Sequence, residues 1–264
     1  AAAGGTPADY GRLAGRLQVA VGGSPLIMAG AMPDAKDSST GVMVLAPGAQ
    51  LLEQDEYAQP EHQKLRNLYH MYIVAMLNGI GESSDAAKTQ ATRILAIEAQ
   101  AAGAMMTQLQ MRDPANTYNI MTLDQAQALV PALDLRAFLG ELGVAAPARV
   151  QVVDINAMKA LQKMLTERSV DEVKLLLRWF LLASRASELG QPWRLQEEAF
   201  TIERKGLKIP PEQKQVVTQQ IGAQLYHPLS QLYVQTYFPD STRRDITEMV
   251  GHIKDEFANR LRRN

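Results

Sequence analysis

The chain has 264 residues, and its 46% hydrophobic content can fill the core of one large domain or of two ordinary ones. Its 27 basic and 28 acidic side chains nearly balance, so the charge totals favour no nucleic acid, anionic membrane or strongly charged substrate as a partner. Because there is no cysteine, disulfides, thiolate zinc sites and cysteine nucleophiles are excluded, whereas the cellular compartment stays open.

Residues 1–60 are predicted to form a loop-rich N-terminal segment that packs on a helical lobe. The start, AAAGGTPADYGR, lacks the charged and apolar regions of a signal peptide, which leaves open whether a leader precedes it. From Gly22 to Pro60 the turn formers in GGSP, MPDAKDSST and APG recur at short intervals. Only residues 42–46 and 26–28 have enough β-branched or apolar side chains for brief strands.

Residues 61–264 are predicted to form the helical lobe, and it begins with two long antiparallel helices. The first has apolar residues at helical spacing from Leu65 to Ile80 and ends at GIGESSD. The second begins at Ser84 and ends at the Arg112-Asp113-Pro114 stop. Nowhere does the chain contain the roughly 18 to 20 uninterrupted apolar residues of a membrane helix, so we expect no membrane span.

The middle of the chain is predicted to consist of shorter helices and one isolated strand. Residues 113–123 are expected to be an extended connection, after which Thr122 can cap a helix over residues 123–130. The sequence VQVV at residues 150–153 is strand-like but is expected to pair only locally. Further helices are expected at residues 133–142, 157–165, 170–189, 196–205 and 211–226, the last with Pro211 in its first turn. The predicted fold class is therefore all-α, with at most a few short strands.

The C-terminal segment His227–Asn264 is predicted to be a compact turn, LYVQTYFPD, followed by a long amphipathic helix. Thr242 with Asp245 three residues later indicates a start that resembles a capping box. The apolar stripe of this helix consists of Ile246, Met249, Val250, Ile253, Phe257 and Leu261. Such a stripe needs a partner surface, and periodicity alone favours the core of the same domain.

Imidazole chemistry has four candidates in this sequence, which are His62, His70, His227 and His252. A helical zinc site of the H-E-x-x-H type needs two imidazoles one turn apart and a glutamate beside the first, and no such pair occurs. His62 and His70 are about two helical turns apart, so they could share one helix face. The simpler interpretation is two surface histidines on a long helix.

The glycine-rich, serine and paired-carboxylate patterns of the sequence also lack the spacing that phosphate binding or acid–base catalysis requires. Gly22-Gly23-Ser24-Pro25 is interpreted as a turn because no lysine follows it as in a phosphate-binding loop, and G-x-S-x-G is absent. Adjacent carboxylates point about 100° apart on a helix, so the pairs are predicted to be solvated. These pairs are Asp171-Glu172, Glu197-Glu198 and Asp255-Glu256. Arg243-Arg244 and Arg260–Arg263 give the last helix basic ends, the second where cations complement the helix dipole.

We therefore predict no catalytic residue, metal ligand or cofactor in this chain, and its substrate-binding residues stay unassigned.

Several motifs together resemble the neprilysin-type zinc metalloendopeptidases, a family that includes bacterial oligopeptidases. The most specific is the D-P-x-x-x-Y-N-x-M-T-L segment, which matches Asp113-Pro114, Tyr118-Asn119 and Met121-Thr122-Leu123. Leu232–Phe238 resembles the family's L-Y-V-x-x-x-F element, and a long amphipathic helix follows in both. Weaker similarities are found at Asp34–Asp37, at Gln54–Tyr57 and at Trp179. LLEQDEY departs from the family's leucine-proline-arginine pattern, so this loop is expected to be placed differently.

The resemblance implies an enzyme of two lobes, in which a mostly helical lobe covers a zinc-bearing, thermolysin-like lobe and encloses a chamber that admits only peptides. This chain resembles the N-terminal, non-catalytic covering lobe. The family's H-E-x-x-H, its further zinc-binding glutamate and its N-A-x-F/Y motif match no residue here. Zinc is therefore expected in the missing catalytic lobe. The expected partners are that lobe of the same polypeptide and an oligopeptide, and an extracytoplasmic location is favoured.

The alternative hypothesis is a stand-alone helical module that binds a peptide or a protein without enzymatic activity. A reading frame that continues past Asn264 into an H-E-x-x-H helix would favour the enzyme lobe, and a stop codon there would favour the module. A complete enzyme with a non-zinc site has no supporting constellation of residues. If the last helix leads toward a catalytic lobe, Phe257 and Leu261 should be less buried than the apolar pattern demands.

Overall fold

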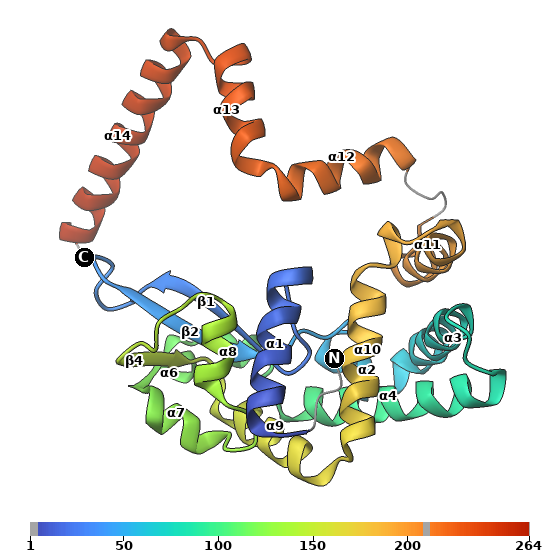
Figure 1. Ribbon diagram of the computed structural model, residues 1–264. Coiled ribbons are helices and arrows are strands. Elements are labelled where there is room, and N and C mark those ends of the chain that lie inside the picture. The colour runs from blue at the N-terminus through green and yellow to red at the C-terminus, as the bar shows by residue number, and fades with distance from the viewer. Residues whose placement is uncertain (1–4, 208–211, 264) are drawn as a thin grey trace. The chain divides into compact units, whose positions relative to one another are not determined.

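The computed structural model describes residues 5–207 and 212–263, which fall into two compact units, residues 1–207 and 208–264. Over these described residues it contains fourteen α helices and one four-stranded sheet, so the predicted mainly helical class is confirmed (Figure 1). The boundary predicted at residue 60 stays a prediction. Each unit is described by itself below.

The sheet of the first unit has the strand order β1-β2-β4-β3. Strands β1 (Ile27–Pro33) and β2 (Gly41–Pro47) form an antiparallel hairpin at the two places where brief strands were predicted. Strand β4 (Arg149–Val152) lies between β2, which it pairs in parallel, and β3 (Asn119–Thr122), which it pairs antiparallel. The prediction that residues 150–153 could pair only locally is therefore wrong, because this short strand gains partners on both sides from distant segments.

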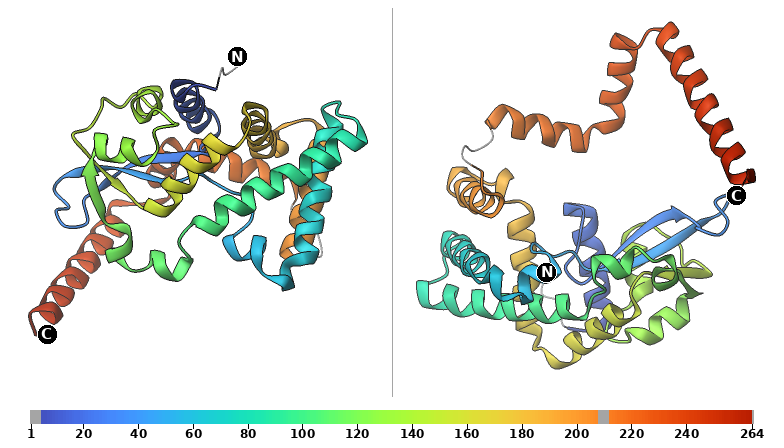
Figure 2. Two further views of the ribbon diagram at one scale, coloured as in Figure 1. Left: turned by 90° about the horizontal axis from the view of Figure 1, so that it is seen from below. Right: turned by 180° about the vertical axis from the view of Figure 1, so that it is seen from behind.

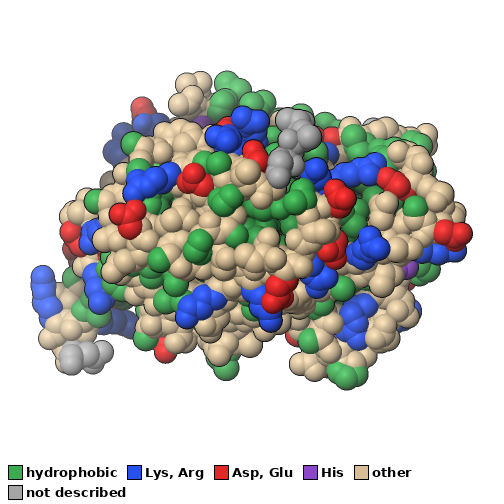
Figure 3. Space-filling model, turned by 60° about the horizontal axis from the view of Figure 1, so that its bottom comes forward, with side chains coloured by type: hydrophobic (Ala, Val, Ile, Leu, Met, Phe, Trp, Pro, Cys, Tyr) green, Lys and Arg blue, Asp and Glu red, His purple; other side chains and the backbone are tan. Residues whose placement is uncertain are grey.

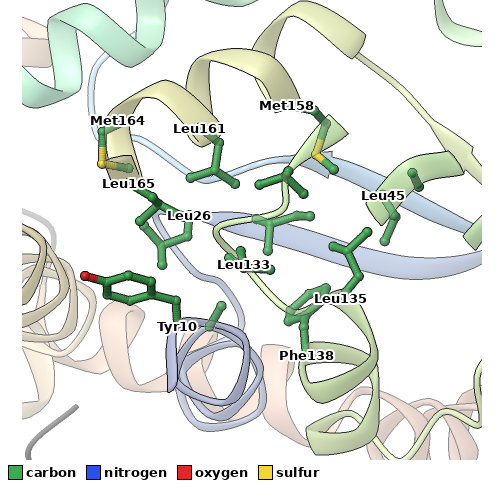
Figure 4. Close-up of a cluster of buried hydrophobic side chains, with 14 of the residues drawn as sticks. Tyr10, Leu26, Leu45, Leu133, Leu135, Phe138, Met158, Leu161, Met164 and Leu165 are labelled. Atoms are coloured by element: carbon green, nitrogen blue, oxygen red, sulfur yellow. The ribbon is translucent and has the colours of Figure 1, made fainter. Parts of the chain in front are cut away.

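Helices on both sides of this sheet form the first hydrophobic core. Helix α1 (Pro7–Val21), which the sequence pattern did not reveal, packs against α8 (Leu135–Glu141). Helices α7 (Leu123–Leu129) and α9 (Ile155–Glu167) add Leu123, Met158 and Leu161. Figure 4 shows Tyr10, Leu45, Leu133 and Phe138 converging with the α9 side chains. The predicted cap of α7 is confirmed, because Thr122 and Gln125 form a capping box.

The second core of this unit is built from long helices. Helices α3 (Gln63–Gly79) and α4 (Ser84–Ala104) pack against each other as the predicted pair (Figure 2). They enclose buried side chains with α2 (Gln54–Ala58), α10 (Val170–Ser184) and α11 (Gln191–Lys205). Trp179 of α10 and Tyr69 of α3 are the largest fully buried side chains here.

Several boundaries differ from the predictions because turns interrupt the periodic pattern. Helix α4 ends at Ala104, so the predicted stop at residue 112 belongs instead to α5 (Gln108–Met111). The segment expected to be an extended connection contains α6 (Pro114–Thr117) as well as β3. Two short 3-10 helices, Pro60–His62 and Ala186–Glu188, precede α3 and α11.

The second unit contains the helices α12 (Gln213–Gln224), α13 (Tyr226–Tyr237) and α14 (Asp240–Arg263). The predicted turn at LYVQTYFPD is wrong, because residues 232–237 form the second half of the helix α13. The predicted start at Thr242 is also wrong, since α14 begins two residues earlier. Pro211 lies outside the described residues.

On the face that Figure 3 shows, basic and acidic side chains are interspersed. None of the helices in the described parts of the chain is long and apolar enough to cross a membrane.

Candidate functional site

An open groove of about 800 Å³ lies in the first unit where β2 and α4 end. One wall is the segment that follows β2, residues 47–55, and the other is the segment after α4, residues 105–112. The half-buried Met105 and Met106 and the exposed Leu109 contribute apolar surface, and Gln50 and Gln54 contribute amide groups. A concave surface that mixes apolar side chains with a few polar groups is typical of ligand and peptide sites.

Both walls of the groove are fixed by side-chain hydrogen bonds to the backbone. Gln54 Nε2 donates to the carbonyl oxygens of Ala102 at 3.0 Å and Met105 at 2.7 Å, where α4 ends. Asp154 is buried and accepts from the backbone N–H of Met106 at 2.6 Å while it also caps α9. The Gln54 bonds end on carbonyl groups at and just after the end of α4, where the helix leaves carbonyls without an internal partner, and the Asp154 bond satisfies the N–H of Met106.

Beneath the first wall lies a buried carboxylate, Glu98 of α4, which is 5% exposed. The hydroxyl of Tyr57 donates to its Oε2 at 3.1 Å, and the hydroxyl of Tyr69 lies 3.0 Å from the same oxygen. Trp179 Nε1 donates to the Tyr69 hydroxyl at 3.0 Å. Burial raises the pKa of Glu98 to about 7, although the hydrogen bonds from Tyr69 and Tyr57 act to lower that pKa.

The same wall is held from its other side by α11. The Arg204 guanidinium donates to the carbonyl oxygen of Leu51 and to Oε2 of Glu56, each at 2.7 Å. Glu56 also accepts from the backbone N–H of Glu53, which closes the first turn of α2. The segment LLEQDEY, which departs from the family's leucine-proline-arginine pattern, therefore contains most of the short helix α2, which packs on α4 and is bonded to Arg204 of α11.

The four histidines lie in separate elements, two in each unit. His62 lies just before α3, and His70 within α3 has its Nε2 3.1 Å from the Thr92 hydroxyl. His227 lies in α13 and His252 in α14. Among residues 5–207 and 212–263, there is no group of three or more His, Cys, Asp or Glu side chains that could hold a metal ion.

The paired carboxylates have separate local roles. Glu172 completes the capping box of α10 with Ser169, beside Asp171 in the same first turn. Glu198 bonds Arg194 at 3.0 Å, and burial raises the pKa of its neighbour Glu197. Near the chain end Glu256, beside Asp255, bonds Arg260 at 2.9 Å.

The glycine and arginine motifs also have structural roles. Gly22 adopts the left-handed conformation that ends α1, as expected of a turn. Arg260 and Arg262–Arg263 occupy the last turn of α14, where cations complement the dipole, and Arg243-Arg244 lie in its early turns.

Sequence reasoning missed the Glu98 cluster, although a signal was present. Glu98 follows Ile94 by four residues and precedes Ala102 by four, so it interrupts the apolar stripe of α4. A charged residue inside an apolar stripe predicts a buried polar group with hydrogen-bond partners. The partners themselves come from α2, α3 and α10, and no local pattern reveals them.

In the second unit, the apolar face of α14 is open. None of its described side chains is buried; Phe257 is 64% and Leu261 63% exposed, as the sequence argument predicted for these two positions. Helix α13 is similarly open, with exposed Tyr233 and Tyr237. We call the α14 residues Ile246, Met249, Val250, Ile253, Phe257 and Leu261 the α14 stripe.

Comparison with known proteins identifies relatives for almost the whole chain. Residues 2–264 match the N-terminal sequence model of peptidase family M13. The mouse endothelin-converting enzyme-like 1 is 23% identical over 80% of this chain and 27% of its own length. The mouse endothelin-converting enzyme 1 is 25% identical over 90% of this chain and 32% of its own length. The chain thus spans about a third or less of these relatives.

Two solved structures share the fold. The zinc metalloprotease Zmp1 of Mycobacterium tuberculosis in its open state superposes with a TM-score of 0.86 and 21% identity, over 94% of this chain and 39% of that one. PepO from Lactobacillus rhamnosis superposes with a TM-score of 0.77 and 18% identity, over 98% and 41% of the two chains. The resemblance drawn from the sequence motifs is confirmed by the family match over residues 2–264: this chain belongs to peptidase family M13, whose N-terminal domain it matches.

Proposed function

We propose that this chain is the non-catalytic covering lobe of a zinc metalloendopeptidase, which encloses a peptide chamber and restricts access to oligopeptides. The observation that carries the proposal is the match to the N-terminal domain of peptidase family M13 over residues 2–264. The zinc metalloprotease Zmp1 supports it, because this chain corresponds to only 39% of that structure. The remainder of such an enzyme would hold the zinc and the catalytic groups.

The proposed role of the lobe is steric. A lobe that roofs a zinc cleft excludes folded proteins and helps to exclude bulk water from the closed site. The described residues supply no cluster of metal-binding side chains, so we assign the zinc to the catalytic lobe of the same polypeptide. An extracytoplasmic location belongs to the proposal through the family resemblance alone.

The α14 stripe supports a partner surface. Exposed apolar surface gains roughly 25 cal/mol for each Å² that a partner covers, and this stripe presents six apolar side chains along one helix. The catalytic lobe is the partner we assign to it. The same stripe is also what the alternative, a stand-alone binding module, would offer to a partner helix.

A series of nested peptides tests the steric role. The product of the complete reading frame is assayed for kcat/KM on peptides of about 8 to 60 residues that carry one cleavage sequence, with an unfolded protein that contains the same sequence as the longest substrate. A covering lobe predicts a steep loss of kcat/KM above a threshold length. Length-independent cleavage would contradict the chamber, and a reading frame that stops after Asn264 would favour the binding module.

A further inference from the structure

We propose that Glu98 is a pH-sensitive latch on residues 50–57, which include most of the first groove wall and are called the wall below: it holds them closed when its carboxyl is protonated and loosens them when it ionises. This inference concerns the chain's own residues and does not depend on the proposed peptidase role. It combines a buried acid, a wall that the acid secures and the lack of a neutralising cation among the described residues.

The orientation of both tyrosine hydroxyls is set by their other partners. The Tyr57 hydroxyl accepts the backbone N–H of Leu52 at 3.4 Å, and the Tyr69 hydroxyl accepts Trp179 Nε1 at 3.0 Å. Each hydroxyl proton is therefore directed at Glu98, at 3.1 Å from Tyr57 and at 3.0 Å from Tyr69. Two donors stabilise a carboxylate, yet neither carries a positive charge.

The wall is attached to the same residue at more than one point. Gln50 Nε2 donates to the backbone carbonyl of Glu98 at 3.0 Å, and Tyr57 closes over the carboxyl group from α2. Leu52, between them, is buried and is bonded to the Tyr57 hydroxyl. Displacement of the wall would therefore remove Tyr57 and Leu52 together and admit water to Glu98.

The charges around the carboxyl leave it unpaired. Tyr57 faces it from α2 and Tyr69 from α3, while α10 contributes the neutral Trp179. On α11, Arg204 is bound to Leu51 and Glu56, and the pKa of Tyr72 is raised by burial and by the charge of Glu197. Among the described residues no cation forms an ion pair with Glu98, and a buried carboxylate without one is costly.

Ionisation therefore favours the open wall. The pKa of Glu98 is raised by burial to about 7 in the closed state and would return toward its usual 4.5 once water reaches it. Below pH 4.5 Glu98 is protonated in both the open and the closed state. Above pH 7 it is ionised in both, and only the closed state then carries the free-energy cost of a buried carboxylate. The equilibrium constant for opening should thus rise by on the order of a hundredfold between pH 5 and pH 9.

Amide hydrogen exchange on the full chain measures this opening. Rates for residues 50–57 are divided by the intrinsic exchange rate at each pH from 5 to 9, and α9 amides in the other core serve as the internal control. We expect protection of the wall to fall by tens-fold or more with rising pH while α9 changes far less. Wall protection that does not vary with pH would overturn the latch.

Two substitutions separate the latch from general loosening. Glu98→Gln keeps the shape without the charge, so its wall protection should not change across this pH range. Tyr57→Phe removes one hydrogen-bond donor to the carboxylate, which raises the pKa of Glu98. The loss of wall protection, which we call release, should therefore move to higher pH. The proposal fails if Glu98→Gln keeps the wild-type pH dependence or if Tyr57→Phe moves release to lower pH, and either result leaves the proposed peptidase role untouched.

Discussion

Serine substitution at Phe257 and Leu261 tests whether the α14 stripe is covered by a partner lobe or by residues 1–264 themselves. A phenylalanine side chain buries about 150–250 Å² when fully covered, so at 64% exposure roughly 130 Å² of Phe257 is still open. At about 25 cal/mol per Å², covering that area would contribute about 3 kcal/mol, and Leu261 at 63% exposure would add about 2 kcal/mol. In residues 1–264 alone, this stabilisation is missing.

The assay is urea unfolding of residues 1–264 and of the product of the complete reading frame, each with and without Phe257→Ser/Leu261→Ser. We expect a loss of less than about 1 kcal/mol in residues 1–264, as for surface substitutions, and of several kcal/mol in the longer product. Phe138→Ala, in the core of the first unit, is the control and should cost about 3–5 kcal/mol in both. A large loss from the double substitution in residues 1–264 alone would refute the reasoning, because the stripe would then be covered by its own chain.

Three further changes test the first unit. The folded-state pKa of Glu98 is raised from 4.5 to about 7, so its stabilising contribution is complete below pH 4.5 and is lost as pH rises to 7. Glu98→Gln should therefore remove up to about 3 kcal/mol from the pH dependence of the free energy of urea unfolding. Parallel pH profiles of wild type and variant would count against this prediction. Gly48→Ala should destabilise by about 1–3 kcal/mol because its Cβ would overlap the carbonyl of Pro25, while Gly103→Ala in the open part of α4 should stabilise by about 0.5–1 kcal/mol; equal midpoints for the two variants would contradict the packing. Thr122→Ala should cost about 1 kcal/mol in thermal unfolding through loss of the α7 cap, and an unchanged Tm would show the cap to be dispensable.

The elements that could be predicted from sequence are those whose signals are local. Apolar spacing and stop signals located α3 and the start of α4, and the side chain of Thr122 located α7. The prediction of a turn at LYVQTYFPD was wrong, because the residues up to Tyr237 belong to the helix α13. The pairing of β4 with β2 could not be predicted, because its partners lie about a hundred residues apart in sequence and the pairing depends on tertiary packing.

The candidate site was less predictable than the fold for the same reason. The motif around Tyr57 and the residue Trp179 were recognised separately as family features, but the cluster around Glu98 that contains them joins four helices, α2, α3, α4 and α10. The interrupted stripe of α4 could have predicted that Glu98 is buried. The stripe could not have predicted that the partners of Glu98 are neutral hydroxyls. The lack of charge on these partners determines whether Glu98 titrates near neutral pH.

Zinc calorimetry combined with a fluorogenic peptide assay tests the central claim most directly. The two proteins compared are residues 1–264 and the product of the complete reading frame. A covering lobe predicts no stoichiometric zinc binding and no hydrolysis by residues 1–264, with one zinc per chain and zinc-dependent hydrolysis in the longer product. Tight stoichiometric zinc binding or zinc-dependent hydrolysis by residues 1–264 alone would contradict the account.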